Sequence, residues 1–519
     1  MHASLRLPPE TRRRLAQAGA TALRLAPPAG CLLVVLGAKL WLIASHGSPT
    51  PFWDQWDAEA VLIYPAWLQG RLGLAELLAP HVDHRILFTR LLAIGLLALQ
   101  DRWDPILQMV AGAVLHVGTL ALVLAVLLRG LGAGERLALC GFAALVFGLP
   151  FGSDNTLWGF QSQFYFLLLF SVAGLVLLVP APAFGPRWWA GLAVACAAYL
   201  GMASGGVALL AVLTVAVLQI AAGQRRGGRE WAALPVYAAL FVGSWLLLPV
   251  LPGNDHLRPA TVLAFVRSLL SAGAWPVVAP HVALGLLAAV ALFVQAPVAL
   301  VAAALWRERP GLRHHGWLLL GLWVWVALQA LAIVYGRGAA FPAPRYLDIF
   351  AVGLVLNFAI LLWTLSRAGA GGRRLAAAAS VWVLVVAAGA GRWFNGSTLF
   401  EIGYRRDMAV IQTERVKAYL ASGDIRELQD RPPLHIPYPT AERLAFALAQ
   451  PGIRERLPPV LLGQDDSEER RRGGLAGFVA RQKESLLKRG PLIAGLGLAL
   501  LLAAATARLR GREADGAPG

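Results

Sequence analysis

The sequence predicts an all-α protein with about 12 (roughly 11 to 13) transmembrane helices. Of its 519 residues, 58% are hydrophobic and 14% are charged, and the mean hydropathy is +0.61. Soluble domains contain about 25% charged residues, so this composition excludes a soluble globular protein. The apolar residues also gather in runs close to the length of about 20 residues that spans a bilayer. A polytopic membrane protein is the class that these observations favour.

The apolar runs follow one another along most of the chain. We expect about twelve of them to form transmembrane helices, with boundaries placed to within several residues. They lie near residues 29–46, 105–128, 137–151, 163–180, 188–203, 205–222, 232–251, 278–305, 317–335, 346–365, 375–391 and 490–507.

The apolar run 86–100 is short and contains Arg90. The positive-inside rule, by which basic residues collect in cytoplasmic connections, decides how it lies. If this run does not cross, the short basic connections all fall on one side of the membrane. A crossing would place Arg129 and Arg136 outside and invert every later connection. We therefore predict a juxtamembrane helix on the outer face, with Arg90 directed to the lipid headgroups.

These assignments give a multi-pass protein of a bacterial-type inner membrane. The long polar stretch 392–487 is predicted to contain helices near 404–420 and 440–450. The predicted regions are a cytoplasmic N-terminus, 1–28; a transmembrane module with a large outer loop at 47–104, 29–391; an extracytoplasmic helical cap, 392–487; and a last transmembrane helix with a cytoplasmic tail, 488–519.

Charge, cysteines and motifs exclude several functions. The net charge is +17, but the basic residues are spread over many short connections, which argues against nucleic-acid binding. Cys31, Cys140 and Cys196 all lie in apolar segments, so the sequence contains neither a disulfide framework nor a CxxC metal site. Walker, HExxH and GxSxG patterns are absent, which argues against nucleotide-driven transport and against zinc or serine hydrolysis.

The first outer loop holds most of the candidate chemistry. Asp54, Asp57 and Glu59 come first, and the run His81-Val82-Asp83-His84-Arg85 follows. A helix that begins at Thr50-Pro51 would place Asp54 and Asp57 on one face and Glu59 on another. The alternative interpretation is an interfacial aromatic belt with solvated acids. Because acidic residues are scarce in this chain, we favour a functional cluster.

Two later outer loops add polar residues on the same side. In the loop 153–163, polar and aromatic residues either close a pair of helices or contact a sugar, with Trp158 stacking on its face. The connection 336–346 carries Arg337 and Arg345, against the inside bias of basic residues. A guanidinium beside an apolar wall suits a phosphate headgroup. Snorkelling of each arginine to the headgroups is the alternative.

The order of these features resembles the GT-C class of membrane glycosyltransferases, in particular protein O-mannosyltransferases and lipid A aminoarabinose transferases. The similar features are a first span, the acidic motif Asp57-Ala58-Glu59, the aromatic Tyr64, Gly70, and a His-containing motif that leads into a surface helix, His81–Leu91. Those enzymes have adjacent Asp-Glu and a His-Pro-Pro or Lys-Pro-Pro element, where this chain has Asp-Ala-Glu and His-Val-Asp-His-Arg. The similarity covers roughly residues 1–130, and the remainder only by topology.

The resemblance implies an inverting transfer of a sugar from a polyprenyl-phosphate donor to a hydroxyl of an envelope lipid, glycan or protein, on the outer side of the membrane. A carboxylate would take the hydroxyl proton, and cationic groups would stabilise the leaving phosphate. A divalent metal is an open option; no other cofactor is implied. The assigned residues are Asp57, Asp54 and Glu59 as catalytic; Arg345, Arg337, Arg85 and His84 as donor phosphate-binding; and His81, Asp83, Tyr64, Trp158, Gln161 and Tyr346 as substrate-binding.

Two other classes of protein fit the same composition. A transporter or flippase of lipid-linked sugars would have polar or charged residues inside its spans and two related halves. The predicted spans contain few ionisable groups, of which His116 is one, and no matching halves. A non-catalytic scaffold of envelope assembly would use the cap as its binding module. Both classes stay open as alternatives.

Overall fold

The computed structural model describes residues 9–249, 254–278, 281–369, 372–464 and 473–516. Within these residues all regular structure is helical, and an isolated bridge between His81 and His84 is the one β-type pairing. The all-α prediction is confirmed. Residues 465–472 of the predicted cap lie outside the described residues.

Among the described residues, eight helical segments are long and apolar enough to cross a membrane. A ninth is added if the bent pair Leu284–Gln295 and Pro297–Glu308, which meet at 51°, forms one span. The polytopic architecture is confirmed, and the number of about twelve spans stays a prediction. The eight segments are Arg24–His46, Pro105–Leu127, Gly159–Leu178, Ala203–Ala221, His315–Arg337, Pro344–Leu365, Gly372–Ser422 and Gly474–Arg510.

Within the described residues each of the twelve predicted spans overlaps a helix or, for 278–305, the bent pair, and four of the twelve fall outside the eight: that pair and the helices α6, α9 and α11. Two of them, α6 and α9, have only 16 residues each, and α11 begins with Arg229 and Glu230 in its first turn. The helices of the bundle are α1 (Pro9–His46), α5 (Pro105–Leu127), α6 (Ala133–Gly148), α8 (Ser162–Leu178), α9 (Pro186–Gly201), α10 (Val207–Ala221), α11 (Gly228–Leu246), α13 (Leu284–Gln295), α14 (Pro297–Glu308), α15 (His315–Arg337), α16 (Pro344–Leu365), α17 (Gly372–Trp393) and α21 (Gly474–Gly516).

Short elements connect these helices and build the end of the molecule that carries the cap. They are the π-helix η1 (Trp56–Ile63), α2 (Tyr64–Leu68), α3 (Leu74–Leu78), α4 (Leu87–Gln100), α7 (Ser153–Leu157), η2 (Gly159–Gln161), η3 (Ala203–Gly206), η4 (Asn254–Leu257), α12 (Val262–Ala274), η5 (Gly338–Ala340), the π-helix η7 (Phe394–Thr398), α18 (Leu399–Ser422), η8 (Ile425–Glu427), α19 (Ala441–Leu448), η9 (Arg454–Arg456) and η10 (Pro459–Leu462).

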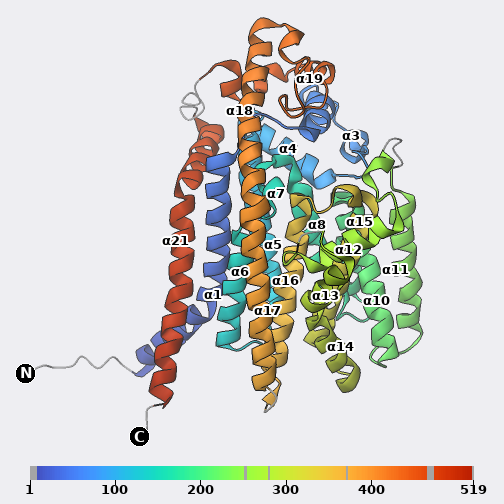
Figure 1. Cartoon of the computed structure of the whole chain (residues 1–519), viewed down its shortest axis with the longest axis vertical. Coiled ribbons are helices and arrows are strands. Elements are labelled where there is room, and N and C mark those ends of the chain that lie inside the picture. The colour runs from blue at the N-terminus through green and yellow to red at the C-terminus, as the bar shows by residue number, and fades with distance from the viewer. Residues whose placement is uncertain (1–8, 250–253, 279–280, 370–371, 465–472, 517–519) are drawn as a thin grey trace, which may run out of the picture.

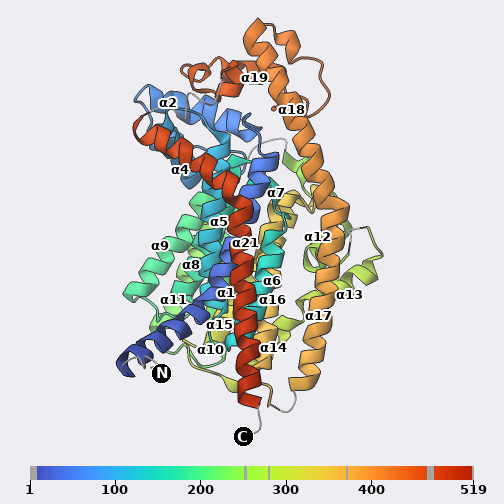
Figure 2. The same cartoon turned by 90° about the vertical axis from the view of Figure 1, so that its left-hand side faces the viewer.

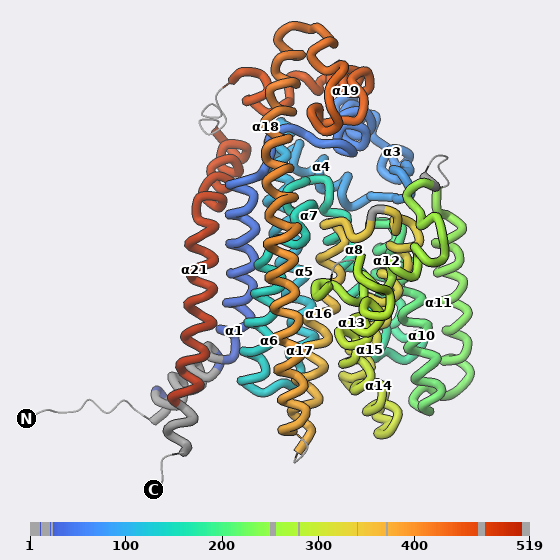
Figure 3. The backbone as a smooth tube through the Cα atoms, in the orientation of Figure 1, coloured from blue at the N-terminus to red at the C-terminus, as the bar shows by residue number. Residues whose placement is uncertain are grey.

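The bundle is built around α16. In its apolar window 94% of the residues are buried, more than in any other span of the described chain. Figures 1 and 2 show both chain termini at one end of the bundle, with the first loop and the cap at the opposite end. The tube in Figure 3 shows α17 continuing into α18, so that one long helix runs from the bundle into the cap.

The cap packs against the first loop through a core of its own. Trp56, Tyr64 and Trp103 of the loop region share this apolar cluster with Val416 of α18 and Leu444 of α19. Backbone hydrogen bonds extend the contact, because the amides of Trp53 and Trp103 donate to carbonyls of the cap, at Pro437 and Arg456. The two helices predicted near 404–420 and 440–450 correspond to α18 and α19.

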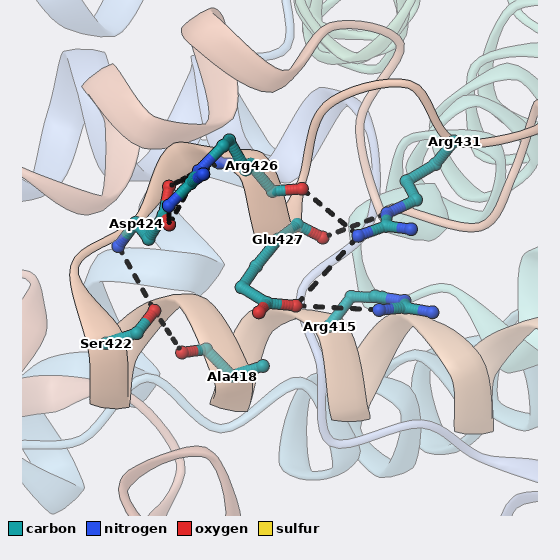
Figure 4. Close-up of polar contacts among 7 residues, drawn as sticks. All are labelled: Arg415, Ala418, Ser422, Asp424, Arg426, Glu427 and Arg431. Atoms are coloured by element: carbon teal, nitrogen blue, oxygen red, sulfur yellow. Dashed lines mark hydrogen bonds and ion pairs between the residues drawn. The ribbon is translucent and has the colours of Figure 1, made fainter.

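Figure 4 shows the turn that ends α18. Arg415 on the helix lies 3.5 Å from the Glu427 carboxylate, and Arg431 approaches the same group at 4.0 Å. Asp424 accepts hydrogen bonds from the backbone and side chain of Arg426. Exposed ion pairs of this kind contribute about 0 to 1 kcal/mol each, so the apolar core, more than these charges, holds the cap in place.

The helix α4 agrees with the predicted surface helix in length but not in its arginine. Its 14 residues reach about 21 Å, short of the roughly 30 Å hydrocarbon layer. The Arg90 side chain is buried, however, and donates to the carbonyl oxygens of Leu77 and Ala79 at 2.9 and 2.6 Å. Arg90 therefore fixes the end of α3 onto α4, and the expectation that it points to the headgroups is wrong.

Glycines allow α1 and α21 to pack with their backbones in contact. A Cβ added to Gly497 would lie 2.6 Å from the carbonyl oxygen of Gly30, and one on Gly490 would lie 3.0 Å from that of Gly37. Close approach of this kind through small residues is typical of helix pairs in membranes. It ties the first and last spans together (Figure 2).

We predict that Gly497→Val lowers the thermal stability of the purified protein, because the added methyl groups separate α1 from α21; overpacking of this type costs about 1–3 kcal/mol. Gly495→Val is the matched control, since a Cβ at Gly495 meets no atom within 4 Å. Thermal unfolding in detergent followed by size-exclusion chromatography measures both. Equal melting temperatures for the two variants would contradict the role of the glycine contact.

Candidate functional site

The polar residues singled out from the sequence gather at the end of the bundle that carries the cap. They come from the first loop, from the short helix α7, and from the connection between α15 and α16 (Figure 1). The sequence separation is large: Asp83 and Arg337, which form an ion pair here, are 254 residues apart.

Asp54 faces the His81–His84 turn. The Asp54 carboxylate lies 3.6 Å from Nε2 of His81, and the His81 ring packs edge-on against Phe160 at 5.0 Å. Reciprocal backbone hydrogen bonds between His81 and His84, at 2.8 and 2.9 Å, close the turn. The turn holds Val82 at φ 50°, a strained conformation for a β-branched residue. The loop therefore presents His81, Asp83 and His84 from one tight segment.

His84 is neutral at pH 7 in this environment. Its pKa is lowered to about 4, first by burial and then by the nearby Arg337, while Asp83 and Asp54 act in the opposite direction. A neutral imidazole binds a ligand through hydrogen bonds and contributes no permanent positive charge. The positive charge of this cluster thus comes from Arg337 and Arg345.

Arg345 is the more available of the two arginines. Arg337 forms an ion pair with Asp83 and its side chain is 19% exposed, whereas the Arg345 side chain is 34% exposed and lies 3.9 Å from Asp154. Asp54 also acts electrostatically on the Arg345 guanidinium. The first acidic residue of the loop and Arg345 therefore belong to one charged cluster.

Arg405 and Asp154 extend this cluster, and neither was assigned from the sequence. Arg405 of α18 lies 3.4 Å from Asp154, donates to the Leu157 carbonyl at 3.1 Å, and stacks over the Phe52 ring at 4.8 Å. Asp154 stands in a short polar loop that the sequence did mark, but its partner lies 251 residues further along the chain. No local pattern indicates such a pairing.

Asp57 points away from Asp54, toward the cap. Its carboxylate accepts hydrogen bonds from the Tyr438 hydroxyl at 2.6 Å and from Arg443 Nε at 2.8 Å. The pKa of Tyr438 is raised to about 12 by partial burial and by this hydrogen bond. The loop forms a π-helix from Trp56 onward, and a π-helix has more residues per turn than an α-helix, so the expected shared face is lost.

Glu59 and Tyr64 lie in a buried network inside the loop. One carboxylate oxygen of Glu59 accepts hydrogen bonds from the Tyr64 hydroxyl at 2.9 Å, from Trp103 Nε1 at 2.7 Å and from Gln108 Nε2 at 2.8 Å. Glu59 is 2% exposed and Tyr64 is 1% exposed. This arrangement joins η1 to the start of α5 and leaves neither residue facing the charged cluster.

We predict that Glu59 makes the stability of the protein depend on pH. Burial raises its pKa to about 7 from 4.5, although the three hydrogen bonds favour the charged form. The folded state then retains a proton that the unfolded chain releases, so this contribution to stability is present below pH 4.5 and is lost as the pH rises to about 7. Glu59→Gln does not titrate.

The melting temperature of the wild type, minus that of Glu59→Gln, should therefore fall between pH 4.5 and pH 7. A series of thermal unfolding measurements at fixed ionic strength gives this difference. A difference that stays constant, or that rises with pH, would show that Glu59 is already ionised in the folded protein.

The remaining predicted contact residues are largely enclosed. Trp158 donates from its indole nitrogen to the Phe52 carbonyl at 3.0 Å and packs edge-on against the Phe52 ring. Gln161 is buried and accepts a hydrogen bond from Gln163, and Tyr346 is buried beside Phe164. These side chains form the floor beneath the charged cluster.

Arg85 lies apart from the charged cluster. The Arg85 guanidinium acts electrostatically on Tyr199 at the end of α9, and its Nη1 has no hydrogen-bond partner among the residues the structure describes.

Across the described part of the chain, no group of three or more His, Cys, Asp or Glu side chains is placed to hold a metal ion. The Asp54 and His81 pair alone does not make such a site.

A polar network lies just below the cluster, inside the bundle. Lys39 of α1 donates to the Thr156 hydroxyl at 2.8 Å and to the Tyr165 hydroxyl at 3.2 Å, and it acts electrostatically on Asp348 of α16. The His116 ring stacks on Tyr165 at 4.4 Å. Lys39 and Asp348 are each 6% exposed. Lys39 and Asp348 both lie inside predicted spans. A charged residue within an apolar run is the sequence signal by which they could have been identified.

The short helix α7 connects this network to the cluster. The Asn155 amide nitrogen donates to Asp348 at 2.8 Å and to the backbone carbonyl of Arg345 at 2.9 Å. Its neighbour Asp154 turns the other way, toward Arg345 and Arg405. One turn of helix thus links the buried charges to the guanidinium groups above them.

We predict strong coupling between Lys39 and Asp348. Lys39→Met or Asp348→Asn alone leaves one buried charge without its counterpart, at a cost of about 3–5 kcal/mol. The double variant loses less than the sum of the two single losses. Thermal unfolding of the four proteins in detergent gives the coupling. Additive losses would show that the two charges do not interact.

A cavity of about 310 Å³ adjoins Asp154 on the side of α18. Its wall includes Phe52 and Gln55 of the loop, Asp154 of α7, and Glu401 and Arg405 of α18. The volume is at the lower end of the range for small-molecule sites.

Comparison with known proteins adds no relative. No family model, no curated protein sequence and no solved structure matches this chain.

Proposed function

We propose that the protein is an inverting glycosyltransferase that moves a sugar from a polyprenyl-phosphate donor to an acceptor hydroxyl of the cell envelope. The observation that carries the proposal is the charged cluster at one end of the bundle, in which Asp54 lies 3.6 Å from His81, Asp154 lies 3.9 Å from Arg345, and Asp54 acts electrostatically on Arg345. A carboxylate and an available guanidinium at that level are the two groups that displacement of a lipid phosphate requires.

In the proposed reaction the acceptor oxygen attacks the anomeric carbon, and the bond from that carbon to the phosphate oxygen breaks. The proton of the acceptor hydroxyl passes to the Asp54 carboxylate. The electron pair leaves with the lipid phosphate, which Arg345 stabilises through its planar pair of donors. A single displacement inverts the anomeric centre.

Asp54 is the better candidate for the base than Asp57 or Glu59. Asp54 and Asp57 are exposed alike, at 34% and 33%, but Asp54 lies beside His81 and acts electrostatically on the Arg345 guanidinium. Asp57 is engaged by Tyr438 and Arg443 of the cap, and Glu59 is enclosed by three donors. A base must reach the proton that it removes, and the geometry of Asp54 alone among the three supports this.

The proposed location is a bacterial-type inner membrane, with the cluster on its extracytoplasmic side. Basic residues occupy the connections α10–α11 and α16–α17, and Figure 1 shows these connections at the same end as the termini. The positive-inside rule assigns that end to the cytoplasm. The sugar donor, membrane lipids and an envelope acceptor are the proposed partners.

A transporter or flippase of lipid-linked sugars is the second candidate. The buried Lys39 and Asp348 favour it, because ionisable residues inside spans are common along transport pathways. Their hydrogen bonds to Thr156 and Asn155 instead support a structural role. A non-catalytic scaffold is the third candidate, and no contact in the described residues favours it over the other two.

The test uses purified protein in liposomes, supplied with a polyprenyl-phosphate sugar and a crude envelope fraction as acceptor. We expect transfer of labelled sugar, reduced about 10²- to 10⁴-fold by Asp54→Asn because the base is lost. Arg345→Lys should also lower the rate, since an ammonium cannot replace a two-point phosphate contact.

Asp57→Asn is the matched control, because this acid lies one helical turn away and holds the cap. It should keep most of the transfer rate. Movement of donor between the leaflets without any product would favour the transporter. Equal activity in Asp54→Asn and wild type would overturn the assignment of the base.

A further inference from the structure

The cavity beside α18 is separate from the groups assigned to the donor phosphate, but it borders them. Its wall contains Asp154 and Pro344, and Asp154 is also the residue that lies 3.9 Å from Arg345. Asp54 does not line it, although its neighbours Phe52 and Gln55 do. A ligand in this cavity would therefore have one end next to the Arg345 guanidinium.

The charges that line the cavity nearly cancel. Asp154 lies between Arg405 at 3.4 Å and Arg345 at 3.9 Å, so its negative charge is shared by two cations. Glu401, which also lines the cavity, has no hydrogen bond or ion pair within the described part of the chain. Arg345 lies outside the lining, so the wall itself carries Arg405 and Asp154, which pair with each other, and Glu401, whose pKa is raised to about 7 by burial and by Asp154. This leaves little net charge to attract either a phosphate or an amine. The Glu401 carboxyl suits hydroxyl groups instead. Gln55 also lines the cavity, but it is buried, and its amide already donates to Gln108 and accepts from the Phe52 backbone.

The outer wall of the cavity is aromatic. Phe400 is 72% exposed and Tyr404 is 45% exposed, and their rings stack 6.3 Å apart on one face of α18. Met408 continues this apolar face into the cavity. The segment lies where the helix α17–α18 leaves the bundle (Figure 2), a level at which aromatic side chains commonly meet the membrane interface. An apolar chain can extend from the cavity along these rings.

We propose that this cavity binds the neutral sugar headgroup of a membrane glycolipid, which serves as the acceptor. The role of acceptor rests on the proposed glycosyl transfer; the binding itself does not. Glu401 hydrogen-bonds the sugar hydroxyls, and the lipid chain lies along Phe400 and Tyr404. Asp154 marks the border at which the acceptor hydroxyl comes close to the phosphate held by Arg345.

The test measures binding directly. Protein in nanodiscs of zwitterionic lipid is exposed to an uncharged alkyl maltoside that carries a diazirine in its chain, and labelled peptides are identified by mass spectrometry. We expect label on the α18 segment 399–412, removed by an excess of dodecyl maltoside. Free maltose and phosphatidylglycerol should not compete, because the first lacks a chain and the second lacks a sugar.

Variants separate the sugar contact from the apolar contact. Glu401→Gln removes one charged hydrogen-bond acceptor and should weaken competition by dodecyl maltoside about 10-fold, which corresponds to roughly 1.4 kcal/mol. Tyr404→Ala should weaken it as well. Glu414→Gln is the matched control, since Glu414 lies on the same helix, pairs with Lys417 at 3.1 Å and does not line the cavity.

Each result has one meaning for the inference. Label outside the cavity, unchanged competition in both Glu401→Gln and Tyr404→Ala, or equal competition by phosphatidylglycerol would overturn it. Equal competition by free maltose would replace the glycolipid by a soluble glycan, and so would also overturn it. Asp54→Asn should retain full labelling. Labelling of wild-type protein that shows no transferase activity would sink the proposed function and leave glycolipid binding standing.

Discussion

The buried pair of Lys39 and Asp348 is the constraint on which the rest of the candidate site depends. A charge inside a bilayer is tolerated only where another group compensates it, and here the compensation draws together α1, α7, α8 and α16. Asn155 and Asp154 are consecutive. The hydrogen bond that Asn155 donates to Asp348 therefore also directs Asp154 toward Arg345 and Arg405 on the outer side. The position of the outer guanidinium groups thus follows from electrostatics within the membrane.

Two acids three residues apart, Asp54 and Asp57, take different positions in this structure. Asp54 faces the His81 turn and Arg345, whereas Asp57 holds Tyr438 and Arg443 of the cap. The cap in turn supplies Arg405 and the aromatic wall of the cavity through α18. A mutation at Asp57 would therefore remove one polar contact of a cap that its apolar core still holds in place, so the two acids should have different phenotypes.

The local character of most helices could be read from the chain because hydropathy is a local property. Within the described residues each of the twelve apolar runs contains helix, α4 has the length of a surface helix, and the cap contains the two expected helices. The side chain of Arg90 could not be placed in the same way. Its partners are the carbonyls of Leu77 and Ala79, and an arginine at the rim of an apolar run has the same sequence signature whether it meets lipid phosphates or backbone oxygens.

For the site, composition and motif order were enough to name the residue types and the end of the molecule at which they gather. The first loop, Arg337 and Arg345 were all marked by polar residues in an otherwise apolar chain. The tertiary structure alone decided that Asp54 rather than Asp57 meets Arg345, that Glu59 is enclosed, and that Arg405 and Asp154 belong to the cluster. The physical reason is that these pairings join segments up to 386 residues apart, as for Asp57 and Arg443, and a π-helix at Trp56 changes the register that an α-helix would impose.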